Sequence, residues 1–111
     1  MAKVKFILLV PLTFNDGSEV SKDVLAGIED ELFVLAGGCT VNGTVKGSYR
    51  MSDGSKQTDT LLELWVVVAE EDQGELRELV GKYGRMLGQE SMYLERVNSD
   101  VEFIPSSPSE E

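Results

Sequence analysis

The most distinctive stretch of the chain is 58–69 (TDTLLELWVVVA), which changes from a polar to an almost continuously apolar pattern. A strand with one solvated face alternates apolar and polar side chains, whereas a strand covered on both faces is apolar throughout. We therefore predict a strand here with two faces that both need cover. The first face carries Leu62, Leu64, Val66 and Val68, and the second carries Leu61, Glu63, Trp65, Val67 and Ala69. A partner subunit, a ligand or a long loop would satisfy the second face.

A second strand of this kind is predicted over 4–12, where Ile7 and Leu9 make the alternate face apolar as well. A weaker strand is expected over 39–50. Its interruption at 42–43 (Asn-Gly) and at Gly47 indicates an edge strand with a bulge. The range 91–97 predicts a fourth strand, and 101–104 predicts a short additional one.

Between these strands lie two stretches whose apolar residues recur at the spacing of an α-helix. The first helix is expected to begin after Ser21, a favourable N-cap, and to end at the glycines 37–38. The second is expected to begin at Asp72, which forms a capping-box pattern with Glu75, and to end at Gly88.

The predicted order is strand–helix–strand–strand–helix–strand. The simplest fold for this order is α+β, the ferredoxin-like split βαβ arrangement (βαββαβ), with an antiparallel sheet of order 4-1-3-2 and two helices on one face. This order makes the first and third strands central, and these are the two strands that are apolar on both faces. We expect one domain over 1–104 and a disordered acidic tail over 105–111.

Composition excludes several classes of function. The chain has 111 residues, a net charge of −10, one cysteine and no histidine. The negative charge disfavours binding to nucleic acid, and no apolar run reaches the length of a membrane span. A single cysteine is typical of a reducing cytoplasm, where we expect the protein to act. Without histidine, the usual general base, the usual catalytic triads and the commonest zinc ligand are lacking. Cys39 has no basic neighbour to activate it, so we interpret it as structural, and no cofactor is expected.

The predicted topology brings polar side chains from several strand ends to one edge of the sheet. This cluster comprises Thr13, Asn15, Asp16, Tyr49, Arg50, Asp59, Gln89 and Glu90. Its three carboxylates and an amide suit a hard divalent cation, although we assign no metal site. Alternatively, Arg50 would bind a carboxylate of a small ligand. The simpler interpretation is that the cluster consists of turn residues and surface ion pairs.

A second candidate site lies on the open face of the sheet. Glu63 shares this face with Trp65, and a carboxylate in an apolar cavity has a raised pKa that suits acid–base chemistry. The simpler interpretation is that Glu63 pairs with Lys46 or Arg50, or lies at the rim of a dimer interface.

Short motifs in a fixed order resemble a known family. They are DG at 16–17, EVS at 19–21, CTV at 39–41, GSYR at 47–50, DG at 53–54 and YGRMLGQES at 83–91. The chain thereby resembles a family of small bacterial ferredoxin-like proteins of unknown function, many of them secreted or lipid-anchored. No export signal is evident in this chain. The resemblance implies the same fold and draws attention to Gln89 and Glu90, but it implies no activity.

We therefore expect a non-catalytic binding or assembly module that forms a homodimer through its open sheet face and holds a small molecule. The candidate binding residues are Tyr49, Arg50, Asp59, Glu63, Trp65, Gln89 and Glu90. The alternative is an enzyme of the dimeric α/β-barrel type, acting on a small organic molecule in a cavity on the sheet face.

Overall fold

The computed structural model describes residues 2–106. Its elements follow the predicted order. They are β1 (Lys3–Pro11), α1 (Lys22–Ala36), β2 (Thr40–Arg50), β3 (Lys56–Ala69), the short 3-10 helix η1 (Glu70–Asp72), α2 (Gln73–Met86) and β4 (Tyr93–Val97).

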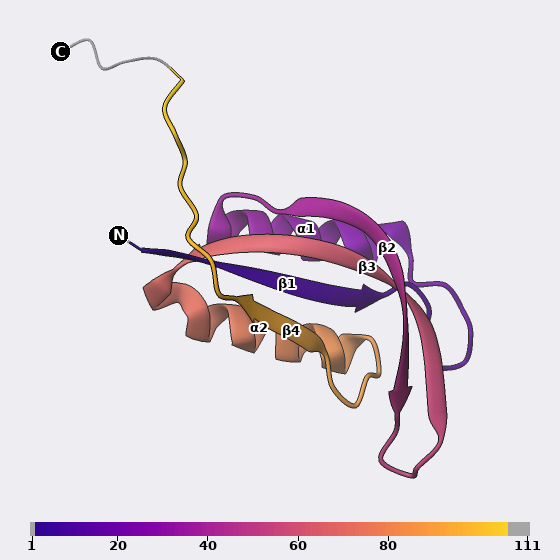
Figure 1. The fold of residues 1–111 in the computed structure, drawn as a ribbon. Coiled ribbons are helices and arrows are strands. Elements are labelled where there is room, and N and C mark those ends of the chain that lie inside the picture. The colour runs from indigo at the N-terminus through magenta and orange to yellow at the C-terminus, as the bar shows by residue number, and fades with distance from the viewer. Residues whose placement is uncertain (1, 107–111) are drawn as a thin grey trace, which may run out of the picture.

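The four strands form one antiparallel sheet in the order β2-β3-β1-β4. This is the predicted 4-1-3-2 order counted from the other edge, and both helices lie on one face of the sheet (Figure 1). The predicted ferredoxin-like α+β fold is confirmed. β1 and β3 are the central strands, as their two apolar faces indicated.

The hydrophobic core lies between the sheet and the helices. In β1 and β3, every second side chain faces the helices and is buried or nearly so. Opposing pairs across the two strands, such as Phe6 with Val66 and Leu8 with Leu64, form the floor of the core. The helices contribute Ile28, Leu32, Leu76, Val80, Tyr83 and Leu87. These burial patterns leave Ile7, Leu9, Glu63 and Trp65 on the opposite, open face.

One helix start matches the prediction and the other differs. The Ser21 hydroxyl accepts a hydrogen bond from the amide of Val24 (3.2 Å), and Gly37 ends α1 with a φ of 84°. The predicted capping box at Asp72 is wrong, because its side chain caps no amide. Instead η1 leads directly into α2, and the carbonyl of Glu70 accepts the hydrogen bond from the Gln73 amide. A preceding turn of helix thus replaces the side-chain cap.

The β2–β3 hairpin is the longest feature of the sheet. Residues 61–69 of β3 pair with β1, so the remainder of the hairpin extends beyond the end of β1 as a curved arm (Figure 1). The predicted bulge in β2 is present as a register shift between Val41 and Thr44. At the tip, Asp53 accepts hydrogen bonds from both the amide (2.8 Å) and the hydroxyl (2.6 Å) of Ser55. These contacts fix the turn that the polar run at 52–55 indicated.

The additional strand predicted over 101–104 does not form. The chain leaves the sheet after β4 and runs away from it as an extended segment, so its backbone has no adjacent strand (Figure 1). Phe103 and Ile104 are consequently exposed. The disordered tail predicted for 105–111 lies largely outside the described residues. Across residues 2–106, no helix combines the length and hydrophobicity that a membrane crossing requires.

The buried hydroxyl of Tyr83 yields a prediction about stability. This hydroxyl finds no hydrogen-bond partner among residues 2–106, and burial, with the nearby Glu31 carboxylate as a smaller cause, raises its pKa. We expect Tyr83→Phe to leave the free energy of unfolding at pH 7 unchanged or slightly higher, since no hydrogen bond is lost.

The same raised pKa makes the folded state lose stability as pH rises above about 10, the ordinary tyrosine value. Tyr83→Phe should weaken this alkaline loss, whereas Tyr93→Phe, which removes an exposed hydroxyl, should leave most of it. Denaturant unfolding of the three proteins at pH 7 and pH 11 measures both effects. A loss above about 1 kcal/mol at pH 7 for Tyr83→Phe would show that its hydroxyl is hydrogen-bonded.

Candidate ligand-binding cleft

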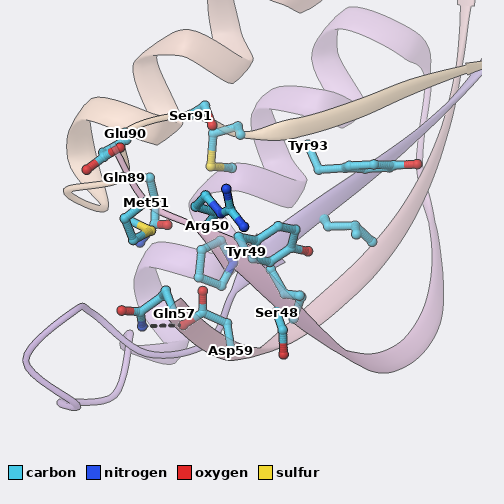
Figure 2. Close-up of a pocket in the computed structure, with 14 residues that line it drawn as sticks. Ser48, Tyr49, Arg50, Met51, Gln57, Asp59, Gln89, Glu90, Ser91 and Tyr93 are labelled. Carbon is cyan, nitrogen blue, oxygen red and sulfur yellow. Dashed lines mark hydrogen bonds between the residues drawn. The ribbon is translucent and has the colours of Figure 1, made fainter. Parts of the chain in front are cut away.

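A cleft of about 460 Å³ opens on the sheet face opposite the helices, where the hairpin arm extends past the end of β1. Side chains from all four strands and from the α2–β4 connection line it (Figure 2). They are Leu9, Pro11, Ser48, Tyr49, Arg50, Met51, Gln57, Asp59, Leu61, Gln89, Glu90, Ser91, Met92 and Tyr93. Clefts of several hundred Å³ with an apolar floor and a few polar groups are typical of small-molecule sites.

Five of the seven predicted site residues line this cleft, namely Tyr49, Arg50, Asp59, Gln89 and Glu90. Asp16 does not line it, because its carboxylate accepts two hydrogen bonds from Ser18 within its own turn. Sequence reasoning missed Met51, Gln57 and Tyr93. The alternation of β2 and β3 would have identified the first two, since each lies two residues from a predicted one. Tyr93 lines the cleft because it pairs with Leu9 across β1 and β4, and this register was not apparent from the sequence.

The ring of Tyr49 packs flat against the backbone of β2. A Cβ atom added at Gly47 would lie only 2.6 Å from the Tyr49 Cζ atom, so the ring occupies the space that a side chain would fill. Glycine at this position leaves room for the aromatic ring to lie across the strand. The phenol end of the ring thus lies over the strand, and the ring forms part of the cleft wall (Figure 2).

Asp59 is the most buried polar residue of the cleft, with 6% of its surface exposed. Its Oδ1 atom accepts a hydrogen bond from Gln57 Nε2 (3.0 Å), two residues earlier on the same face of β3. Leu61, the next residue on that face, is 4% exposed although it lies outside the core between sheet and helices. The open face is therefore already covered at this end by the walls of the cleft.

Glu90 and Gln89 are engaged by the protein itself. Glu90 accepts hydrogen bonds from the amide (3.2 Å) and the hydroxyl (3.0 Å) of Ser52 at the hairpin tip. Gln89 donates long contacts of 3.4 Å to Asn15 and to the Leu87 carbonyl, while Asn15 donates to the Gly88 carbonyl (3.0 Å). These two residues tie the α2–β4 connection to the arm and to the β1–α1 loop, so they shape the cleft.

Arg50 lies at the cleft without an acidic partner. The ion pairs formed within residues 2–106 are Lys82–Glu31 (2.7 Å) and Arg96–Glu70 (3.9 Å). The surface ion pairs expected at this edge of the sheet are thus missing from the described part of the chain. The Arg50 guanidinium remains available to an anionic group.

Glu63 and Trp65, the other two predicted residues, lie farther along the open face. Glu63 Oε2 accepts hydrogen bonds from Trp65 Nε1 (2.7 Å) and Asn42 Nδ2 (3.0 Å), so the expected pairing with Lys46 or Arg50 is wrong. The alternation along β2 is shifted by the bulge, which brings Asn42 to Glu63. Because its carboxylate accepts two donors, Glu63 holds the indole in place.

At the other end of the open face, Trp65 is in contact with Lys5 and borders a surface pocket. The ammonium group of Lys5 lies 3.8 Å from the centre of the indole ring, a cation–π contact. Residues 99–102, which follow β4, line a surface pocket together with Trp65 and Val67. The second face of β3 thus lines the cleft at one end, and at the other end it lines a surface pocket together with the start of the C-terminal segment.

The acids at the sheet edge do not converge. Within residues 2–106 no three cysteine, histidine, aspartate or glutamate side chains lie close enough to hold a metal ion. Cys39 is half-buried, and burial, with the Glu29 carboxylate as a smaller cause, raises the pKa of its thiol. A raised pKa lowers the thiolate fraction and disfavours a nucleophilic role.

Comparisons with known proteins find likeness in structure alone. No family model matches this chain, and no curated protein matches it either. A phage SAM lyase solved with S-methyl-5'-thioadenosine is similar, with a TM-score of 0.69, 15% identity, and coverage of 86% of this chain and 81% of the other. The divalent cation tolerance protein Cut A1 from Thermus thermophilus is similar with a TM-score of 0.61, 16% identity and coverage of 91% and 87%. At these identities the likeness shows a shared fold.

The contact between Ser52 and Glu90 generates a prediction about the cleft wall. Glu90→Ala removes both acceptors of Ser52, so we expect the amides at the hairpin tip, 51–55, to exchange with solvent several-fold faster. The pair is exposed, so the global free energy of unfolding should fall by less than about 1 kcal/mol. Hydrogen exchange followed by mass spectrometry measures the first effect. Unchanged exchange at the tip would show that Glu90 does not hold the arm.

Proposed function

We propose that this protein is a homo-oligomeric binding module that holds a small organic molecule in the cleft beside the hairpin arm. The observation that carries the proposal is the Tyr49 ring, which lies over Gly47 and forms a wall of a cleft of about 460 Å³. An aromatic wall offers a planar ligand a surface for stacking.

The lining of the cleft suits a ligand with three kinds of surface. Tyr49 and Tyr93 suit a planar ring, the thioethers of Met51 and Met92 suit an apolar group, and Asp59 suits a hydrogen-bond donor. S-methyl-5'-thioadenosine, present in the phage lyase of similar fold, combines a purine, a ribose and a methylthio group. The proposal rests on this match of chemistry, since the likeness between the two chains is one of fold.

We also propose that two copies associate through the open sheet face. Ile7 and Leu9 are half-buried there, Tyr93 is 46% exposed, and Trp65 lies on the same face. Burying such apolar surface is worth about 25 cal/mol per Å². A symmetric pairing of this face is the simplest association for a single chain.

An enzyme acting on the cleft ligand is the second candidate. It is supported by the lyase of similar fold and by two groups in the same cleft, the buried Asp59 and Arg50, which forms no ion pair within residues 2–106. Together they offer one negative and one positive charge. Its reaction would have to proceed without histidine, which the chain lacks.

The binding proposal predicts stabilisation by the right class of ligand. In a thermal-unfolding screen with S-methyl-5'-thioadenosine, adenosine, aromatic amino acids, simple carboxylic acids and divalent cations, at least one organic compound should raise the midpoint. A compound at a hundred times its dissociation constant adds about 2.7 kcal/mol, and each 1 kcal/mol raises the midpoint by about 4–8 °C for a chain of this size.

Tyr49→Ala should abolish that shift, whereas Phe33→Ala, which removes an exposed aromatic ring on α1, should leave it unchanged. Chromatography of the ligand after incubation separates binding from catalysis, because a converted ligand would establish the enzyme. A screen in which no organic compound shifts the midpoint would contradict the proposal.

The association proposal predicts a change of mass. The wild type should elute as a dimer in size-exclusion chromatography with light scattering, and Trp65→Glu should be monomeric, because two added carboxylates would face each other across the interface. Glu71→Gln, on the exposed surface of η1, is the control and should remain dimeric. A monomeric wild type would contradict the proposal.

A further inference from the structure

The cleft contains a buried carboxylate with one oxygen unused by the protein. Asp59 Oδ1 is bonded to Gln57, and Figure 2 shows the second carboxylate oxygen directed into the cleft. Neither ion pair within residues 2–106 includes Asp59. The Asp59 residue is only 6% exposed, and its second oxygen, which no protein donor contacts, is left to accept a hydrogen bond from water or from a ligand in the cleft.

The sheet register places this oxygen next to the aromatic wall. Gly47 pairs directly with Asp59 across the two strands of the hairpin, and the Tyr49 ring lies over Gly47. Side chains of directly paired residues are about 5 Å apart. A ligand that stacks on Tyr49 therefore brings its substituents within reach of the Asp59 carboxylate.

This juxtaposition specifies the ligand. We propose that the cleft binds a nucleoside, with its base against Tyr49 and its ribose hydroxyls donating hydrogen bonds to Asp59. This inference rests on the proposed binding function and deepens it. The free Asp59 oxygen can accept a hydrogen bond from a ribose hydroxyl, and acidic side chains bind ribose hydroxyls in dinucleotide-binding folds.

The charges of the cleft indicate which nucleosides or nucleotides would bind. Asp59 and Glu90 both contribute carboxylates to the lining, and the chain carries a net charge of −10. The two carboxylates and the overall negative charge outweigh the single Arg50 guanidinium in the same cleft, so we expect a neutral or cationic nucleoside to bind more tightly than a nucleotide. Gln57 acts as a positioning residue, because its amide fixes the carboxylate with one oxygen toward the ligand.

The test compares adenosine with 2',3'-dideoxyadenosine by isothermal titration calorimetry on the full chain. The wild type should bind adenosine at least about tenfold more tightly than the dideoxy compound, because the latter leaves the buried Asp59 oxygen without a donor. In Asp59→Asn, adenosine should bind about tenfold more weakly and the difference between the two compounds should shrink to about twofold. Glu71→Gln changes the net charge equally, away from the cleft, and should bind as the wild type does.

The outcomes separate this inference from the broader proposal. If adenosine and its dideoxy analogue bind the wild type equally, or if neither binds while another organic compound from the thermal screen does, the nucleoside assignment is wrong and the binding module stands. If no organic compound binds, the binding proposal itself fails. Circular dichroism shows whether the Asp59→Asn variant is folded. If the variant is unfolded, the relative affinity of the wild type for adenosine and 2',3'-dideoxyadenosine alone tests the nucleoside assignment.

Discussion

The pairing of β1 with β3 is the interaction on which the rest of this structure depends. Where they pair, both strands carry apolar side chains on both faces. One face of their antiparallel ladder therefore forms the floor of the core, and the other forms the apolar open face of the sheet. The helices cover the first surface. What covers the second differs along its length, and this difference creates a cleft at one end and a tryptophan held by Glu63 at the other.

The length mismatch between these two strands explains where the cleft forms. β1 ends at Pro11, opposite Leu61, whereas β3 begins five residues earlier at Lys56. A hairpin without a third strand beside it is free to twist and curl, and strongly twisted ribbons are typical of two-stranded pairs. The arm curls past the end of β1, and Glu90 ties its tip to the α2–β4 connection. The walls of the cleft therefore follow from strand length, and its chemistry follows from which residues lie on the inner face of the arm.

Much of this architecture could be predicted from hydrophobic periodicity, because a period of two with apolar residues on both faces identifies a central strand wherever it occurs. The sheet order, the bulge at 42–43 and the N-cap at Ser21 followed from such local signals. The partners of Glu63 could not be predicted, because a register shift in β2 decides them and no local pattern encodes its size. The start of α2 differed from the prediction because η1 precedes it. The Glu70 carbonyl of η1 accepts the hydrogen bond from the Gln73 amide, so no side-chain cap is needed there. Topology placed five of the predicted residues around one cleft, but the division between those that leave polar atoms free in the cleft and those that hold the arm required the hydrogen bonds.

The same strand that is interior over 61–69 becomes an edge strand over 56–60, and the sequence changes with it. On the side where β1 would lie, the backbone of this segment pairs with no strand, although the Thr60 carbonyl still accepts a hydrogen bond from the Leu12 amide (3.0 Å). Unpaired edges invite pairing with other chains, and proteins protect them with charged and polar side chains. The residues KQTDT at 56–60 provide this protection. The transition from polar to apolar within β3 therefore marks the point at which the strand gains a second neighbouring strand, and the exposed side chains of Lys56, Thr58 and Thr60 keep the arm polar before it.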